Sequence, residues 1–237
     1  MQHEFEYVSK KSPKVKAAYN DLMQLLREVR KDLRTYYTFQ HKIIGSYARN
    51  MITYDRKSNI GFDFDVNIYP NDEEEKLTAK RIKLLFKQSL DNHVQSHGFD
   101  FAEDSTRVLT IKVKDRKQSR IIYSVDFAFV NDYEDDDGNE CQEYIHYNKQ
   151  QNCYTWKQQS NGYYRLSEKI QWIKENGLWE SDLKPYYLEK KNRNTDSNVH
   201  SRTLFAISVH EICQKNGYRE EVNSWVFSAI IERGIMN

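Results

Sequence analysis

The stretch Gly61-Phe62-Asp63-Phe64-Asp65-Val66-Asn67-Ile68 alternates apolar and polar residues from Phe62 onward. Alternation with a period of two is typical of a β-strand, in which the side chains of residues i and i+2 point to the same face. The stretch therefore predicts a strand that buries one face and projects Asp63 and Asp65 together from the other.

A second run, Ile121-Ile122-Tyr123-Ser124-Val125-Asp126-Phe127-Ala128-Phe129-Val130, places a third acid in a largely apolar strand. If the two strands pair, Asp63, Asp65 and Asp126 share one face, where like charges repel and hydration is lost. Mg²⁺ is a natural counter-charge, because it prefers hard oxygen ligands. The three acids therefore indicate metal-assisted phosphoryl or nucleotidyl transfer. The alternative is a solvent-facing row on an amphipathic strand, but the acid in the second strand favours the functional interpretation.

Composition narrows the class of protein. The 237 residues include 36 basic and 35 acidic ones, and this balance gives no sign of a protein that coats nucleic acid. The three cysteines lack Cys-x-x-Cys spacing, which favours a reducing compartment. No signal core is visible at the N-terminus, and no window approaches the roughly 18 apolar residues of a membrane helix. We therefore expect a cytoplasmic protein without a membrane segment.

The apolar periodicity predicts an α+β fold in two parts. We expect an α/β domain over residues 1–160, which begins with a helix capped by Ser12-Pro13, and a helical domain over residues 161–237. A short helix and a loop are expected over residues 47–59. The other expected helices cover 13–33, 70–97, 167–176, 180–191, 201–215 and 220–233, and the expected strands cover 38–44, 61–69, 108–113, 121–130, 143–147 and 153–157.

The order of three motifs resembles a known family. Gly45-Ser46 follows a strand, Asp63-x-Asp65 lies in the next strand, and Asp126 lies in a later one. This order is similar to that of the polymerase-beta-like nucleotidyltransferase superfamily. The resemblance implies a mixed sheet flanked by helices, in which Gly45 and Ser46 hold a nucleoside triphosphate. It further implies that Asp63 and Asp65 bind two metal ions and that Asp126 binds the catalytic one.

Three further residues are assigned to the triphosphate. Arg49 lies one helical turn after the Gly-Ser pair, where it contacts phosphate or faces solvent. It stands in an Arg-Asn pair where many family members have Arg-Gly. In the helical part, Lys190 or Lys191 together with Ser201 resembles the triphosphate contacts of poly(A)-polymerase-like and cyclic-oligonucleotide-synthase-like members. We assign Lys191 and Ser201; the alternatives are a solvated lysine face and a helix cap.

These features predict an enzyme that moves a nucleoside monophosphate from an NTP to a hydroxyl and releases pyrophosphate, with Mg²⁺ or Mn²⁺. A nucleotide or RNA is the favoured acceptor. An antibiotic- or toxin-type transferase that acts on a small molecule, tRNA or protein is an alternative, and so is a nucleotide-binding module without turnover. The oligomeric state is not predicted. His93 and His97 have a zinc-like spacing but no third ligand nearby in the sequence, so we expect surface histidines.

Overall fold

The computed structural model describes residues 3–58, 61–72, 76–159, 164–196 and 199–219. It divides the chain into two compact units, Met1–Asn161 and Gly162–Asn237. In the described residues, no helix has the length and apolar character needed to cross a membrane.

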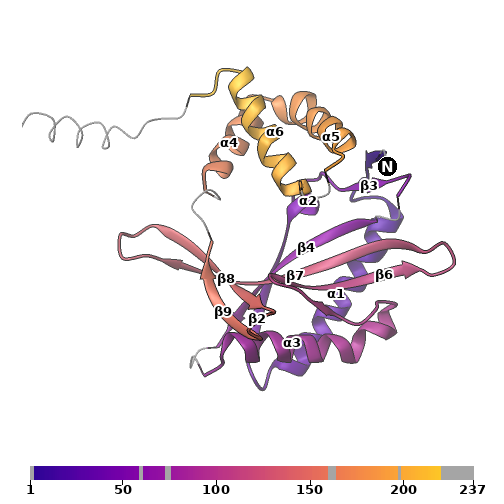
Figure 1. Ribbon diagram of the computed structural model, residues 1–237, viewed down its shortest axis with the longest axis vertical. Coiled ribbons are helices and arrows are strands. Elements are labelled where there is room, and N and C mark those ends of the chain that lie inside the picture. The colour runs from indigo at the N-terminus through magenta and orange to yellow at the C-terminus, as the bar shows by residue number, and fades with distance from the viewer. Residues whose placement is uncertain (1–2, 59–60, 73–75, 160–163, 197–198, 220–237) are drawn as a thin grey trace, which may run out of the picture. The chain divides into compact units, whose positions relative to one another are not determined.

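The first unit is built on a mixed seven-stranded sheet (Figure 1). Its strand order is β2-β4-β7-β6-β5, and β8 pairs with β7 and with β9. β4 and β7 are parallel, whereas β2 pairs with β4 and β6 pairs with β7 in antiparallel fashion. A separate two-stranded sheet joins β1 to β3. The strands are β1 (Phe5–Tyr7), β2 (Thr38–Ile44), β3 (Thr53–Asp55), β4 (Phe62–Asn71), β5 (Glu103–Asp104), β6 (Val108–Asp115), β7 (Arg120–Glu134), β8 (Glu140–Asn148) and β9 (Cys153–Gln158).

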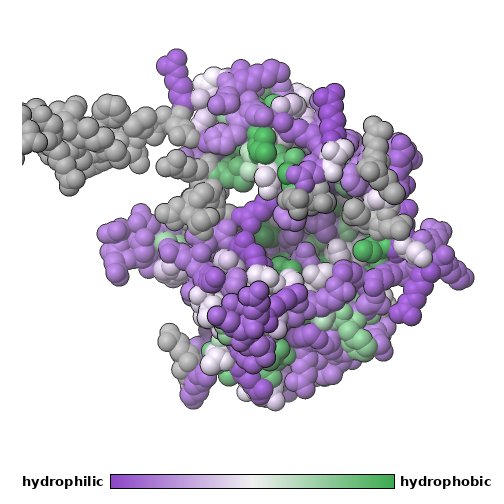
Figure 2. Space-filling model, in the orientation of Figure 1, coloured by the Kyte–Doolittle hydropathy of each residue, from purple (hydrophilic) through white to green (hydrophobic). Residues whose placement is uncertain are grey.

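Helices α1 (Pro13–Leu33) and α3 (Ala79–His93) pack against the apolar face of this sheet. The side chains of Ser12 and Thr78 cap their N-termini. Phe64 of β4 and Phe86 of α3 are fully buried in the shared core. Because the apolar residues of β4 all point inward, its polar residues must occupy the opposite face. The side of the molecular surface that Figure 2 shows is mainly hydrophilic, as expected when the apolar side chains are buried in the core.

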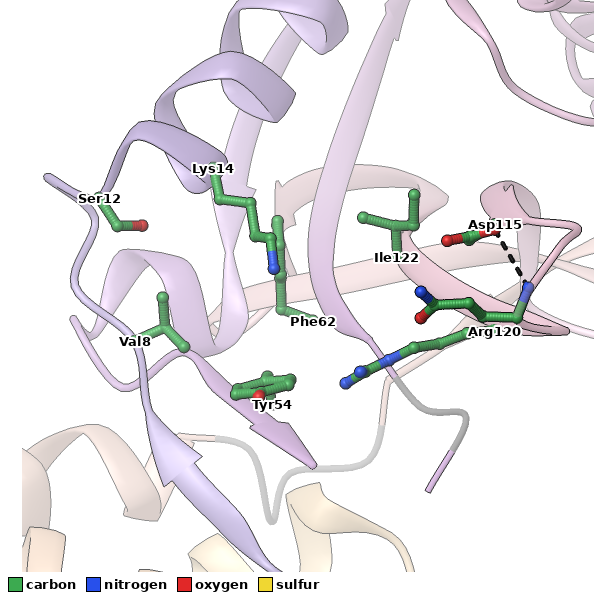
Figure 3. A pocket seen from close by; sticks show the side chains of 9 residues that line it. Val8, Ser12, Lys14, Tyr54, Phe62, Asp115, Arg120 and Ile122 are labelled. Carbon is green, nitrogen blue, oxygen red and sulfur yellow. Dashed lines mark hydrogen bonds between the residues drawn. The ribbon is translucent and has the colours of Figure 1, made fainter. Parts of the chain in front are cut away.

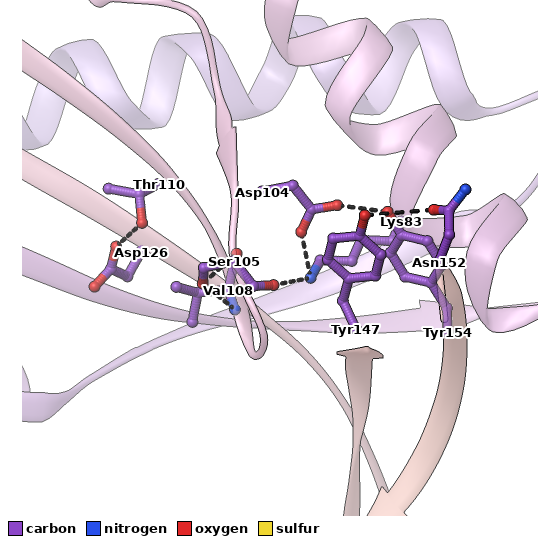
Figure 4. A network of polar contacts seen from close by, with 9 residues as sticks. All are labelled: Lys83, Asp104, Ser105, Val108, Thr110, Asp126, Tyr147, Asn152 and Tyr154. Carbon is purple, nitrogen blue, oxygen red and sulfur yellow. Dashed lines mark hydrogen bonds and ion pairs between the residues drawn. The ribbon is translucent and has the colours of Figure 1, made fainter. Parts of the chain in front are cut away.

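A buried ion pair anchors the β8–β9 hairpin (Figure 4). Lys83 of α3 has no exposed side-chain area, and its Nζ lies 2.8 Å from Asp104 Oδ1 and 3.1 Å from the carbonyl oxygen of Ser105. The Tyr154 hydroxyl of β9 donates a 2.7 Å hydrogen bond to Asp104 Oδ2, and Tyr147 of β8 stacks on Tyr154. Helix α3, β5 and the hairpin therefore meet at one charged pair.

The structure corrects two predicted elements. The helix expected from residue 70 is wrong at its start, because β4 continues through Pro70 to Asn71 while β2 pairs with it as far as Thr38↔Asn71. The helix begins only at Ala79, and residues 73–75 lie outside the described part. The expected loop over residues 47–59 contains β3, which pairs with β1. The predicted hairpin between residues 143 and 157 is present.

The second unit is helical in its described part. Tyr187 and Phe205 meet at a ring-centroid distance of 5.6 Å in its core. The helix predicted over residues 201–215 has those bounds, whereas the one predicted over 180–191 is split between a π-helical turn and a helix. The helix predicted over 220–233 lies outside the described residues. The elements are α4 (Tyr164–Glu175), η3 (Trp179–Leu183), α5 (Lys184–Arg193) and α6 (Ser201–Lys215).

Candidate active site

Strand pairing brings the three predicted aspartates to one face of the sheet. In the parallel register of β4 and β7, Asp65 lies opposite Asp126 and Asp63 lies opposite Ser124. Asp63 and Asp65 are two residues apart on β4, so their side chains share a face. The neighbouring apolar residues Phe64 and Val125 are fully buried on the other face. The register thus creates a carboxylate row on the side of the sheet that faces away from α1 and α3.

Asp126 is an aspartate of this row whose pKa is clearly shifted. Burial raises the pKa of Asp126, and the nearby Asp63 carboxylate raises it further. Two contacts oppose this effect: the Thr110 hydroxyl donates a 2.5 Å hydrogen bond to Asp126 Oδ1 (Figure 4), and Lys112 contributes positive charge. Lys112 also pairs with Glu103 at 2.6 Å. The charged form of Asp126 is therefore disfavoured in the protein alone, and a cation at the row would offset that cost.

The Gly-Ser turn lies directly against Asp65. Ile44, the last residue of β2, pairs with Asp65, and Gly45 opens the short helix α2 (Gly45–Ala48) with a φ of +64°. A Cβ atom at Gly45 would overlap the Asp65 carboxylate. Glycine is thus required twice, by the left-handed backbone and by the close approach. Tyr47 holds α2 against the core, because its ring lies 5.2 Å from the ring of the buried Phe64.

Two polar residues, Ser46 in α2 and Arg49 at its C-terminal end, follow this turn in the chain. The Ser46 Oγ is buried and has no hydrogen-bond partner among the described residues. A buried hydroxyl without a partner is costly, so this atom is suited to a ligand oxygen. Arg49 follows as the C-cap of α2, where its backbone N–H donates to the carbonyl oxygen of Gly45 at 3.2 Å and its side chain is half-buried.

The donor set fits a hard divalent cation in its chemistry. Carboxylates from two adjacent strands supply oxygen ligands. The charged form of Asp126 is disfavoured in the protein alone, so a bound cation would stabilise it. Across the described ranges, no group of three or more His, Cys, Asp or Glu side chains is arranged to hold a metal ion. The three aspartates therefore lie on one face but do not form a complete coordination sphere. To bind one metal ion together, their side chains must rotate about their torsions.

The predicted residues of the helical part belong to the second unit. Lys190 Nζ forms a 2.8 Å ion pair with Glu211 and lies 4.9 Å from the Tyr186 ring, so it already has an anionic partner. Lys191 is half-buried near the end of α5. Ser201 is the exposed first residue of α6, and the N-cap position is His200. The predicted role of Lys191 and Ser201 toward a triphosphate stays a prediction.

Sequence reasoning missed Thr110. It lies opposite Asp126 in the antiparallel register of β6 and β7, and its hydroxyl is the hydrogen-bond donor to that carboxylate. The alternation Val108-Leu-Thr-Ile-Lys-Val113 does place Thr110 and Lys112 on the polar face of a strand. The sequence offers no register, however, so the pairing of Thr110 with Asp126 could not be read from it.

The chain is similar in structure to several solved nucleotide synthases. It is 16% identical to the STING-associated CdnE c-di-GMP synthase from Capnocytophaga granulosa, with a TM-score of 0.54 over 92% of this chain and 65% of that one. It is 15% identical to GTP-bound DncV from Vibrio cholerae, with a TM-score of 0.52 over 83% of this chain and 53% of that one. It is also 15% identical to the CdnE cyclic dinucleotide synthase of Elizabethkingia meningoseptica with GTP and Apcpp, with a TM-score of 0.50 over 86% and 70%.

These likenesses concern the fold. The chain spans about half the length of DncV and about two thirds of the Capnocytophaga synthase. No protein-family model matches the sequence, and no curated protein matches it. The predicted α+β fold, a mixed sheet flanked by helices, is confirmed, and these synthases share that fold.

Proposed function

We propose that the chain is a nucleotidyltransferase that moves a nucleoside monophosphate from an NTP to the hydroxyl of a second nucleotide and releases pyrophosphate. The observation that supports this most is the register that sets Asp65 against Asp126 while Gly45 abuts the same Asp65 carboxylate. One face thereby combines three hard anionic ligands with a turn suited to phosphate. Within this proposal, residues 1–160 form the catalytic domain and residues 161–237 the helical domain, in keeping with two compact units.

Each residue has a distinct task in the proposed reaction. The Gly45-Ser46 backbone holds phosphate oxygens together with the Ser46 hydroxyl, which has no hydrogen-bond partner in the described part of the chain, and Arg49 adds positive charge. Asp63, Asp65 and Asp126 would hold Mg²⁺ or Mn²⁺. When bound, such ions supply Lewis acidity at the attacking and leaving oxygens of an in-line displacement. The acceptor oxygen bonds to the α-phosphorus as the bond to the pyrophosphate oxygen breaks.

Similarity favours a nucleotide over RNA as the acceptor. DncV from Vibrio cholerae, which has a TM-score of 0.50 to this chain in that complex, is seen with the linear intermediate 5′ pppA(3′,5′)pG. That protein is a cyclic AMP-GMP synthase. By analogy, we propose a linear or cyclic dinucleotide as the product of this chain, with Lys191 and Ser201 contributing to triphosphate binding.

The test is turnover of labelled NTPs, singly and in all pairs, with Mg²⁺ or Mn²⁺ and with products identified by mass. Asp65→Asn and Asp126→Asn each replace a carboxylate with an isosteric amide. Asp132→Asn is the matched control, since Asp132 is an exposed aspartate of the same strand as Asp126. A dinucleotide made by the native chain and by Asp132→Asn, but not by the site variants, supports the proposal. Binding of NTP without any product would identify a binding module, and product from the Asp65→Asn variant would contradict the metal ligands proposed here.

A further inference from the structure

A cavity lies on the first unit, at the N-terminal ends of β4 and β7 (Figure 3). Its volume is about 410 Å³, within the roughly 300–1,000 Å³ of typical small-molecule sites. It opens between the start of α1, strand β3 and the β6–β7 hairpin. Its lining includes Val8, Lys14, Tyr54, Phe62, Arg120 and Ile122.

The floor of this cavity is apolar and aromatic. Phe62 is only 3% exposed and stacks on Tyr123 in the core, so its position is fixed. Ile122 also packs against the core, and Tyr54 lies across from them (Figure 3). A floor of this kind favours the flat, apolar part of a ligand.

Two cations reach into the cavity over this floor. Lys14 Nζ lies 5.9 Å from the centre of the Tyr54 ring and Arg120 Cζ lies 5.1 Å from it, and the two side chains approach from different sides (Figure 3). Arg120 Nη2 donates a 3.0 Å hydrogen bond to the carbonyl oxygen of Asp55, which holds the guanidinium in place. Within the described part of the chain, neither cation forms an ion pair with a carboxylate.

Among the described residues that line the cavity, Asp115 is the one acid, and its carboxylate has other partners. Asp115 lies opposite Arg120 in the β6–β7 register, but its carboxylate accepts the backbone N–H groups of Lys117 and Gln118 at 3.0 and 3.2 Å. It therefore closes the hairpin turn instead of neutralising Arg120. The charge over the apolar floor is net positive, which suits an anionic group.

We infer that this cavity binds a small organic anion in which an apolar ring carries one phosphate or carboxylate group. The ring lies on Phe62, Ile122 and Tyr54, and the anionic group lies between Lys14 and Arg120. The site is distinct from the carboxylate row, because none of Asp63, Asp65 and Asp126 belongs to the lining of this cavity. The inference therefore goes beyond the proposed nucleotidyl transfer and does not depend on it.

The experiment is calorimetric titration of the full chain in EDTA with three probes: 2-naphthyl phosphate, 2-naphthol and inorganic phosphate. We expect 2-naphthyl phosphate to bind at least about tenfold more tightly than either fragment, since it engages both the floor and the cations. Lys14→Gln and Arg120→Gln should each weaken it by about tenfold. Lys16→Gln is the matched control, because Lys16 is an exposed lysine one position beyond Val15 on the same helix and is not part of the lining.

Several results would overturn the inference. The inference fails if 2-naphthyl phosphate does not bind at concentrations up to about 1 mM, or if 2-naphthol binds with the same affinity. It also fails if Lys16→Gln weakens the binding of 2-naphthyl phosphate as much as Lys14→Gln does. Displacement of the probe by ATP with Mg²⁺ would place it at the Gly45-Ser46 turn and would also contradict the inference. If Arg120→Gln does not fold, because it loses the bond to Asp55, Lys14→Gln decides the question. None of these readouts requires turnover, so failure here is distinguishable from failure of the proposed enzyme activity.

Discussion

Asp65 and Asp126 lie directly opposite each other across the parallel pairing of β4 and β7. Adjacent strands are about 4.8 Å apart, so two carboxylates in this register are close neighbours on one face. The pKa of Asp126 is raised, first by burial and then by the Asp63 carboxylate of the same face, so its charged form is unfavourable in the protein without a cation. A cation bound at this face would relieve the repulsion between the carboxylates.

Replacing Asp126 with Asn should stabilise the protein when metal is absent. The pKa of Asp126 is raised above 3.8 in the folded state, so its stabilising contribution is fully present below pH 3.8 and is lost as the pH rises through the folded-state pKa. At pH 7 in EDTA, Asp126→Asn should therefore raise the free energy of unfolding by on the order of 1 kcal/mol. Urea denaturation between pH 7 and pH 4 measures this, and the gain should shrink toward pH 4.

Asp132→Asn serves as the control here too, because Asp132 is an exposed residue of the same strand. Its effect should stay within about 0.5 kcal/mol. If Asp126→Asn destabilises the metal-free protein at pH 7, the carboxylate row is not under electrostatic strain and the argument for a cation loses its physical basis.

Gly45→Ala should damage both folding and activity. The left-handed backbone alone costs an alanine roughly 1–2 kcal/mol, and overlap with the Asp65 carboxylate adds to this cost. Gly138→Ala separates the two effects, since Gly138 also has a positive φ of 76° but has nothing within 4 Å of an added Cβ. We expect a larger fall in melting temperature for Gly45→Ala than for Gly138→Ala, together with loss of NTP binding only in the former. Equal losses would mean that the contact with Asp65 is unimportant.

Thr110 should act as a positioning residue for Asp126. Thr110→Val keeps the shape of the side chain but removes the hydroxyl that donates to Asp126 Oδ1, whereas Thr110→Ser retains it. We expect Thr110→Val to lower kcat about tenfold and to raise the concentration of Mg²⁺ needed for half-maximal activity. Recovery of both quantities in Thr110→Ser would identify the hydroxyl as the cause. If the valine and serine variants behave alike, the hydrogen bond has no role in holding the carboxylate.

The Lys83–Asp104 pair should couple strongly in a double-mutant cycle. Asp104→Asn leaves a fully buried ammonium without its counter-charge, and a loss of about 3–5 kcal/mol is typical of such cases. The Lys83→Met, Asp104→Asn double variant removes both charges and should lose less than the sum of the single variants. Denaturant unfolding gives the coupling energy, and additive losses would show that the two groups do not interact across α3 and β5.

Much of the fold could be predicted from the sequence, because it follows from local patterns. Alternation over residues 62–68 assigned the buried and polar faces of β4, and Ser12-Pro13 marked the start of α1. The strand over residues 38–44 and the helix over 201–215 have their predicted bounds. Periodicity and capping depend on neighbours within a turn or two, and the printed sequence contains all of those neighbours.

Only the tertiary structure decided which side chains meet. Thr110 faces Asp126 because of the β6–β7 register, and a slip of one residue would turn it to the other face. His93 and His97 were expected to be surface histidines, and the sequence did not indicate partners for them. The packing of α1 against α3 places Asp32 at 2.8 Å from His93 and Glu28 at 2.9 Å from His97.

Pro70 was expected to open a helix and instead extends β4, because β2 continues to pair beside it. The sequence by itself thus determined the elements that follow from local patterns and the polar face of β4, while contacts between residues far apart in the chain determined register, partners and the extent of β4. Such contacts form only when strands and helices pack, and their energies depend on three-dimensional neighbours that no local pattern contains.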